Sequence, residues 1–160
     1  MNDLVIRPLR NETEARDCAA RIAGTEPWKS IHFPAEQVLL RLTNPKREVF
    51  VAELDGQMVG ALILHLDGVL NGYLQTIVVF SEFQCRGLGK QLMSFAEEKI
   101  FRQSPNVFLC VAHFNEHAQK FYAQLGYQKV GELENYLQSG LTEILMRKTR
   151  GPLLAFTPEK

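Results

Sequence analysis

Hydrophobic residues recur along the chain with two different periods, and each period predicts a different kind of element. The first 45 residues predict one strand and two helices. We place the strand at residues 4–7, stopped by Pro8, one helix at residues 12–23, ended by Gly24, and a second helix opened by Pro34 and ended by Asn44-Pro45. The irregular stretch between the helices, residues 25–33, holds the only tryptophan, Trp28.

The next part of the chain has the alternation and the turn residues of antiparallel strands. Residues 48–54 and 57–66 flank Asp55-Gly56, a dipeptide that favours a two-residue hairpin turn. Asp67-Gly68 turns the chain again before a third strand at residues 73–79. Because tight turns join them, we expect these sequential strands to be antiparallel.

The hydrophobic period then changes to that of a helix. One helical face carries its apolar side chains, which are Leu88, Leu92, Phe95, Ala96 and Ile100. Ser104-Pro105 ends this helix, and the continuous apolar run at residues 107–112 is typical of a strand buried on both faces. A strand, a helix and a buried strand form a βαβ unit, so we expect the strands at residues 73–79 and 107–112 to be parallel.

The last third of the chain predicts one more helix and a final strand. Asn115 is suited to cap the helix and Gly126 to end it. Its inner face carries Ala118, Phe121, Tyr122 and Leu125. The final strand lies at residues 141–148, with Thr142, Ile144 and Met146 on one face, and two prolines predict an irregular tail at residues 151–160. We therefore expect one α/β domain with a mixed sheet at residues 1–150, followed by that tail.

The charge balance narrows the classes of function. The chain has 18 basic and 18 acidic residues, whereas binding to nucleic acid or to an anionic membrane favours a basic excess. No apolar run approaches the roughly 20 residues that span a bilayer, and residues 1–10 lack the layout of a signal peptide. We expect a cytoplasmic protein that binds neither nucleic acid nor membrane.

The cysteines favour reduced thiols over a disulfide framework or a metal site. Cys18, Cys85 and Cys110 are odd in number and scattered. Cys110, His113 and His117 lie close in sequence, but the odd spacing between Cys110 and His113 turns their side chains to opposite faces of a strand. The sequence offers no fourth ligand, so we expect no metal.

The stretch Gln84-Cys85-Arg86-Gly87-Leu88-Gly89-Lys90, called the glycine turn below, separates a strand from a helix. It fails the Rossmann pattern, because Leu92 stands where a third small residue is needed, and the P-loop pattern, because Gln91 follows Gly89-Lys90. Backbone N–H groups at a helix N-terminus nonetheless bind anions, and glycine removes the Cβ that would hinder their approach. On the residues alone, a plain turn is as consistent with this stretch as a pyrophosphate cradle.

The order of the motifs resembles the GNAT superfamily of acyl-CoA-dependent N-acetyltransferases. Gln84-x-x-Gly87-x-Gly89 opens an amphipathic helix, and Asn115-x-x-Ala118-x-x-Phe121-Tyr122 with Leu125-Gly126-Tyr127 follows one βαβ unit later. The resemblance covers residues 49–147. It implies a single domain with a mixed, mostly antiparallel sheet, helices on both faces and a splayed parallel strand pair, and it implies acetyl-CoA as the cosubstrate.

The resemblance also implies which residues bind acetyl-CoA. The pyrophosphate would lie on the N–H groups of the glycine turn, pantetheine would pair with backbone groups of the preceding strand, and the asparagine would contact the cofactor arm. The implied residues are Ile77, Val78, Val79, Gln84, Cys85, Arg86, Gly87, Leu88, Gly89, Lys90 and Asn115. Tyr122 would point at the thioester sulfur as the catalytic residue, although an aromatic on an inner helical face is otherwise a core residue.

The general base of some relatives has no counterpart. Relatives that acetylate protein N-termini carry a glutamate on the strand before the asparagine helix, and Cys110 stands at the matching position. A neutral thiol in a buried strand is a poor base, which leaves Tyr73, Gln75 and Glu53 as substitutes or water holders. We therefore expect the ionisation of the amine to dominate the dependence of activity on pH. We also expect the amine to attack acetyl-CoA directly in a ternary complex, without an acyl group on Cys110.

The resemblance implies that the acceptor is a primary amine, on a small molecule or at a peptide or protein N-terminus. It also implies that Trp28, Phe33 and Tyr136 line the acceptor pocket, with Tyr73 and Gln75 as further candidate substrate-binding residues. The leading hypothesis is an N-acetyltransferase whose partners are acetyl-CoA and this amine, with a homodimer as one option for its assembly. The alternatives are a noncatalytic acyl-CoA-binding or sensor domain on the same scaffold, and a purely structural α/β domain.

Overall fold

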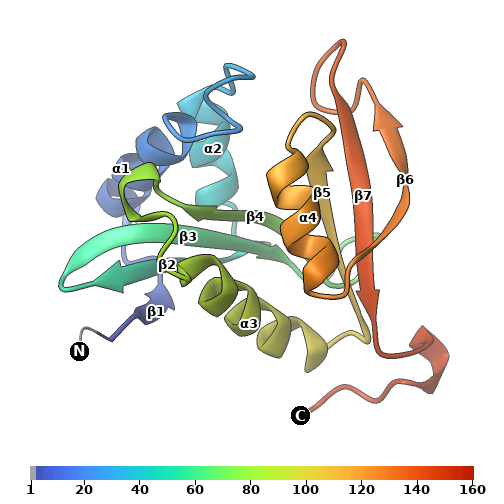
Figure 1. Cartoon of the computed structure of the whole chain (residues 1–160). Helices are drawn as coiled ribbons and strands as arrows, with labels where there is room; N and C mark the ends of the chain where they lie inside the picture. Colours follow the sequence, from blue (N-terminus) through green and yellow to red (C-terminus); the bar gives the residue numbers. More distant parts are fainter. Residues whose placement is uncertain (1–2) are drawn as a thin grey trace. The chain divides into compact units, whose positions relative to one another are not determined.

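The computed structural model describes residues 3–160. It is an α/β protein with a seven-stranded sheet in the order β1-β2-β3-β4-β5-β7-β6 (Figure 1). The mixed, mostly antiparallel character of the sheet agrees with the expectation from the sequence. The chain divides into two compact units. Unit 1 is Met1–His65 and Leu74–Glu98, and unit 2 is Leu66–Tyr73 and Lys99–Lys160.

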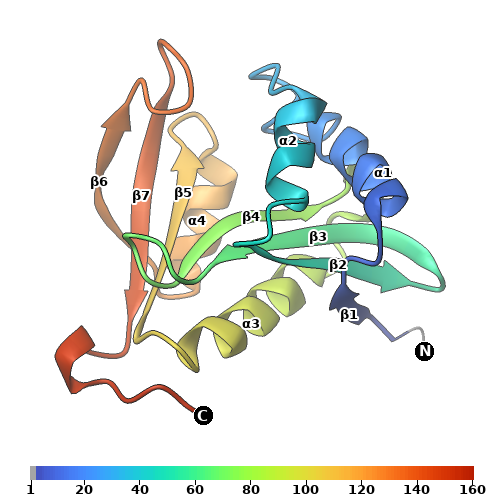
Figure 2. The same cartoon turned by 180° about the vertical axis from the view of Figure 1, so that it is seen from behind.

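Unit 1 holds helices on both faces of its strands. Its elements are β1 (Val5–Pro8), α1 (Glu12–Ala23), α2 (Ala35–Leu42), β2 (Glu48–Leu54), β3 (Gln57–His65), β4 (Tyr73–Val79, whose first residue belongs to unit 2), the 3-10 helix η1 (Ser81–Phe83) and most of α3 (Leu88–Phe101). Helices α1 and α2 lie on one face and α3 on the other (Figures 1 and 2). The buried core between α1, α2 and the strands includes Cys18, Ile22, Val51, Ile63 and Phe80.

Local signals in the sequence explain where these elements begin and end. The side chain of Asn11 accepts a hydrogen bond from the N–H of Glu14 and caps α1, which ends at Gly24 as predicted. Asp55 and Gly56 have φ values of 52° and 76°, the left-handed geometry that a two-residue hairpin requires. The prediction for β1 was wrong at its end, because the strand includes Pro8. As an edge strand, β1 tolerates a residue without an N–H.

An ion-pair network joins three elements of unit 1. The guanidinium of Arg7 on β1 lies 2.6 Å from a carboxylate oxygen of Glu14 on α1 and 2.6 Å from one of Glu53 on β2. The hydrogen bond from Arg7 lowers the pKa of Glu14. Because Glu53 is held in this network, its carboxylate has a structural partner.

Unit 2 consists of strands with one helix over them. Its elements are β5 (Asn106–Ala112), α4 (Glu116–Gln124), β6 (Gln128–Glu134), β7 (Thr142–Thr149) and the 3-10 helix η2 (Leu153–Ala155), which lies in the tail. Strand β7 is antiparallel to both β5 and β6, and α4 lies over one face of these strands (Figures 1 and 2). The expected parallel pair is present, with Tyr73 opposite Phe108.

Two features of unit 2 differ from the sequence predictions. Strand β6 was not predicted, because Gln128, Lys129 and Val130 are all exposed and give no burial pattern. Strand β5 is not buried on both faces. Val107, Leu109 and Val111 are buried, whereas Phe108 and Cys110 are half-buried. One face of β5 is therefore partly exposed, although the sequence of this strand is apolar throughout residues 107–112.

Gly72 fixes where β4 begins. Its φ is +86°, and a Cβ at this position would lie 2.1 Å from the carbonyl oxygen of Asn106. Only glycine fits such a backbone contact. The carbonyl of Gly72 in turn accepts a hydrogen bond from the N–H of Phe108 at 3.0 Å. This contact places Tyr73 beside β5, where it is paired with Phe108 and hydrogen-bonds with Cys110.

Candidate functional site

The glycine turn has the backbone geometry of an anion-binding concavity. Cys85 and Gly87 have φ values of 61° and 76°, and α3 begins at the next residue, Leu88. The first N–H groups of a helix have no intrahelical acceptor, and left-handed turn residues before them form an anion-binding hollow. A Cβ at Gly87 would meet no protein atom within 4 Å, so the space beside it is open.

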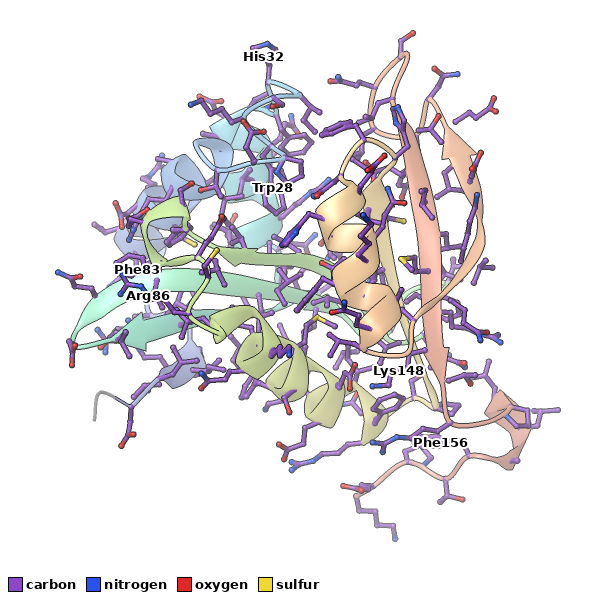
Figure 3. The ribbon with its side chains drawn as sticks, viewed as in Figure 1. Trp28, His32, Phe83, Arg86, Lys148 and Phe156 are labelled. Atoms are coloured by element: carbon purple, nitrogen blue, oxygen red, sulfur yellow. The ribbon has the colours of Figure 1, made fainter. Side chains whose placement is uncertain are left out.

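The side chains of the turn secure its backbone. The amide of Gln84 donates to the carbonyl oxygen of Val79 at 3.0 Å, which ties the turn to the end of β4. Arg86 donates to the carbonyl oxygen of Glu82 at 3.3 Å, and its guanidinium lies 5.5 Å from the centre of the Phe83 ring (Figure 3). Exposed Arg86 and Lys90 add positive charge, whereas the side chain of Leu88 is buried and leaves only its backbone to a ligand.

The segment that leads into the turn is anchored by Arg21 on α1. Its guanidinium donates to the carbonyl oxygen of Met58 and to the carboxylate of Glu82, both at 2.5 Å, and lies 4.1 Å from the centre of the Phe80 ring. At the end of β4, Val78 is buried while Ile77 and Val79 are half-buried. The cofactor-binding residues expected in unit 1 therefore form one continuous segment with a fixed approach.

Asn115 caps α4, as the sequence predicts. Its side-chain oxygen accepts a hydrogen bond from the N–H of Ala118 at 3.2 Å. Tyr122 lies one turn further along, buried, with the rings of Phe121 and Tyr127 at 5.4 and 5.9 Å between centroids. Burial raises the pKa of Tyr122, so its hydroxyl keeps its proton through the physiological range.

The half-open face of β5 and β7, called the Cys110 face below, carries Phe108, Cys110, Ala112, Glu143, Leu145 and Arg147. The Tyr73 side chain hydrogen-bonds with the thiol of Cys110. Burial raises the pKa of Cys110, and the hydrogen bond from Tyr73 offsets that rise only in part. The thiol is therefore neutral at physiological pH, which agrees with its expected weakness as a base.

The other candidate substitutes for the base have structural partners. Gln75 on β4 accepts a hydrogen bond from Arg47 at 2.9 Å, and Glu53 is paired with Arg7. Tyr73, in contrast, hydrogen-bonds with Cys110 itself.

The candidate acceptor residues come from both units. Trp28 packs against the core of unit 1, and Phe33 lies with its ring centre 4.7 Å from the guanidinium of Arg41. Figure 3 shows Trp28 on the segment between α1 and α2, which also carries His32. Tyr136, between β6 and β7 in unit 2, is 58% exposed.

Sequence reasoning missed Glu143. This glutamate of β7 is only 5% exposed, and its charge raises the pKa of Cys110. The signal in the sequence was a single acidic residue within the apolar run of the last strand, and it could be interpreted only once the register of β7 was known.

Within residues 3–160, no group of three or more His, Cys, Asp or Glu side chains is placed to hold a metal ion. Among the helices of the same residues, none is long and apolar enough to cross a bilayer.

Comparison with known proteins gives consistent matches. Residues 12–127 match the acetyltransferase (GNAT) family. An uncharacterised N-acetyltransferase from the pepI 3′ region of Lactobacillus delbrueckii subsp. lactis is 35% identical over 99 residues, which are 57% of this chain and 57% of that protein. The N-alpha-acetyltransferase RimI of Mycobacterium tuberculosis is 29% identical over 146 residues, 86% of this chain and 88% of that protein.

A solved structure matches the fold over nearly the whole chain. The crystal structure of an aminoglycoside 6′-N-acetyltransferase complexed with coenzyme A has a TM-score of 0.74 and 21% identity, over 92% of this chain and 98% of the other. At 21% identity this likeness shows the fold alone. The match of residues 12–127 to the family model shows the family. The chain thus belongs to the GNAT family of acyl-CoA-dependent N-acyltransferases.

Proposed function

We propose that this protein transfers an acetyl group from acetyl-CoA to a primary amine by direct attack in a ternary complex. One observation carries the proposal. The chain combines a left-handed glycine turn at the start of α3 with an Asn115-capped helix that buries Tyr122. A plain turn requires neither the exposed helix start nor the open space beside Gly87.

Unit 1 supplies the cofactor contacts in this proposal. The backbone N–H groups of residues 85–90 bind the pyrophosphate, with Arg86 and Lys90 as weaker electrostatic contributors because both are exposed. Backbone groups of Ile77, Val78 and Val79 pair with pantetheine as an added strand does. Gln84 acts through its bond to Val79, which fixes the turn relative to that strand.

Unit 2 supplies Asn115, which contacts the cofactor arm in this proposal, and Tyr122. A free thiol has a pKa of ~8.5 and a tyrosine ~10, so full proton transfer from tyrosine to thiolate is uphill by about 2 kcal/mol. The raised pKa of Tyr122 makes that transfer less favourable still. Tyr122 therefore stabilises the charge that develops on sulfur by a hydrogen bond, and the proton that neutralises the sulfur comes from the attacking amine.

The first candidate acceptor is the α-amine of a peptide or protein N-terminus. The likeness to an N-alpha-acetyltransferase over 86% of the chain supports it, and an α-amine, with a pKa of ~7.7–8.0, is partly neutral at physiological pH. Trp28, Phe33 and Tyr136 are the proposed contacts of the acceptor, with Tyr73 and Gln75 nearer the reacting amine. A small-molecule amine is the second candidate, on the fold likeness to an aminoglycoside acetyltransferase.

The cellular setting is part of the same proposal. We place the protein in the cytoplasm, since Cys18, Cys85 and Cys110 are all free thiols. The balanced charge, 18 basic and 18 acidic residues, supports a protein without affinity for nucleic acid or membrane. A homodimer is the proposed assembly, and light scattering at micromolar concentration tests it.

Thiol release on a panel of amines tests the reaction. The panel contains a peptide with a free N-terminal alanine, the same peptide N-acetylated with a free lysine side chain, spermidine and kanamycin. We expect amine-dependent release of CoA, fastest with the first peptide. Calorimetric binding of acetyl-CoA without release on any amine would contradict the catalytic proposal and support a noncatalytic acyl-CoA-binding domain.

A further inference from the structure

The register of β5 and β7 brings a carboxylate beside the position where the expected base is absent. Ala112 pairs with Glu143, and Cys110 pairs with Leu145. Side chains two residues apart on a strand point to the same face, so Glu143 and Cys110 are diagonal neighbours, typically about 7–8 Å apart. Some relatives carry a glutamate at the position of Cys110 on β5. In this chain a carboxylate, that of Glu143, lies near this position on the adjacent strand β7.

The face that carries Glu143 is the one away from α4. Val107, Leu109 and Val111 of β5 are buried, as are Ile144 and Met146 of β7. They lie on the opposite face, together with Lys148. The side chain of Lys148 lies beside Gly126 and Tyr127, just after α4, so this is the face that α4 covers. Tyr73 pairs with Phe108 and hydrogen-bonds to Cys110, so it joins Glu143 on the Cys110 face.

Glu143 is 5% exposed, so its carboxylate is withdrawn from bulk water. Electrostatic interactions are stronger in such a setting than in water. Burial raises the pKa of the nearby Cys110, and the charge of Glu143 adds to that rise, so this carboxylate already acts on a group of the Cys110 face. A cationic amine that reaches this face would interact with it more strongly than with a surface carboxylate.

We propose that Glu143 binds the cationic amine of the acceptor and takes its proton, as the general base of the acetyl transfer. This inference rests on the proposed function. In this proposal the ammonium nitrogen gives one proton to the carboxylate of Glu143, and its freed lone pair forms the C–N bond as the C–S bond breaks. The second proton leaves the nitrogen for the sulfur, which the hydroxyl of Tyr122 stabilises, and the proton on Glu143 returns to water with product release.

Several ionisable groups lie on the strands around Glu143. Cys110, Tyr73 and Arg147 share its face, and His113, just after β5, contacts the carbonyl oxygen of Thr142 at 3.2 Å. On β6, Leu133 pairs with Glu143, so Glu132 and Glu134 point to the opposite face. Among the paired residues of β5 and β7 on the Cys110 face, Glu143 is the one that carries a carboxylate.

Glu143→Gln removes the charge and keeps the shape, and kinetics with the alanine peptide test the consequence. We expect kcat/KM at pH 7 to fall by about a hundredfold, the lower part of the range for a general base. Acetyl-CoA affinity and melting temperature should be preserved. Above the pKa of the α-amine, ~7.7–8.0, the gap to wild type should narrow, since a neutral amine needs no base. The sequence analysis expects activity to follow the ionisation of the amine and to rise with pH. This rise should then be seen in the Glu143→Gln variant.

Glu134→Gln is the matched control, because it removes an exposed carboxylate from the neighbouring strand on the other face. We expect it to retain wild-type kinetics. Glu143→Asp keeps a carboxylate and should recover part of the activity at pH 7. A Glu143→Gln enzyme within threefold of wild type, or one slowed equally at every pH, would overturn the proposal and make Glu143 a structural residue.

A binding experiment keeps the inference separate from the proposed function. The alanine peptide is titrated at pH 6, where its amine is charged, into protein saturated with desulfo-CoA, which carries no thioester. Binding to wild type should be at least tenfold tighter than binding to Glu143→Gln. This difference without turnover would overturn only the proposed catalysis. If wild type and Glu143→Gln bind the peptide equally well, Glu143 does not recognise the amine. If wild type does not bind the peptide at all, the proposal that Glu143 binds a peptide amine is wrong.

Discussion

The glycine turn of unit 1 and the Cys110 face of unit 2 are built in opposite ways. The turn is exposed and offers backbone groups, and its side chains serve mainly to hold that backbone. The Cys110 face is half-buried and offers side chains, with Tyr73, Cys110 and Glu143 in electrostatic contact. A backbone site depends on conformation and tolerates changes of side chain, whereas a side-chain site depends on the identity of each group.

The sharpest test of the backbone site is Gly87→Val. The φ of +76° is strained for a β-branched residue, and the new Cβ would occupy the open space that the pyrophosphate needs. We expect acetyl-CoA to bind about a hundredfold more weakly, a loss of about 3 kcal/mol, as measured by calorimetry. Gly56→Val is the matched control, with the same φ of +76° and equally open space. It should lose stability and keep cofactor affinity. Equal losses of affinity in both variants would attribute the effect to strain alone.

Tyr122→Phe tests a single hydroxyl in unit 2. The ring keeps its contacts with Phe121 and Tyr127, so the fold should be preserved. A donor to charge in the transition state contributes about 3 kcal/mol, so kcat should fall roughly a hundredfold with acetyl-CoA affinity unchanged. An unchanged kcat would leave Tyr122 as a core aromatic and direct attention to Tyr73 and Tyr136 as donors.

Arg86→Ala tests the claim that the turn works through its backbone. The guanidinium packs near Phe83 and bonds to the carbonyl of Glu82, and an exposed charge contributes about 0–1 kcal/mol to an ion pair. We expect acetyl-CoA affinity to fall less than tenfold. A loss as large as that of Gly87→Val would show that the anion is held by this side chain.

Cys110→Ala tests whether the half-buried thiol takes part in the chemistry. It should keep most of the activity and lose about 1 kcal/mol of stability, because the substitution leaves a small cavity beside Tyr73. Steady-state kinetics should be those of a ternary complex, and mass spectrometry should find no acetyl group on Cys110. An acetylated Cys110, or ping-pong kinetics, would contradict direct transfer.

The smallest effect is expected far from both sites, at Glu14. Its pKa is lowered by Arg7, so the ion pair contributes stability above the ordinary glutamate pKa of ~4.3 and loses it as the pH falls through the folded-state value. Glu14→Gln should cost about 1 kcal/mol at pH 7, flatten the decline in melting temperature at acid pH, and leave the kinetics unchanged. An unaltered acid profile would mean that other carboxylates dominate it.

Local signals allowed much of the fold to be predicted. Asp55-Gly56, Asn115 and Gly126 each determine their own neighbourhood, so the hairpin and α4 lie where the sequence places them. Strand β6 escaped prediction because an edge strand with exposed Lys129 and Val130 has no apolar alternation. Its place depends on pairing with β7, which local sequence does not encode.

The candidate site divides in the same way. The glycine turn was found from its residues, since its chemistry lies in one continuous segment. Glu143 was not found, because its meaning depends on the pairing of Ala112 with Glu143 across two strands. The contact between Tyr73 and Cys110 likewise requires a parallel register that a crossover connection leaves open in sequence. Sequence reasoning therefore predicts a candidate site within one continuous segment more readily than a candidate site assembled from several strands.

Arg21 links the stability of α1 to the order of the segment that leads into the glycine turn. Its guanidinium contacts Phe80 and Glu82, which lead into the glycine turn, and also Met58 on β3, so it holds this segment against α1 and β3. Ordering a loose loop costs roughly 1–2 kcal/mol of conformational entropy per residue, and the contacts of Arg21 would remove part of that cost from the proposed binding of acetyl-CoA. If heat frays α1, the turn becomes disordered and every binding event must restore its order. The protein should then release its substrate at temperatures where most of its strands are still intact.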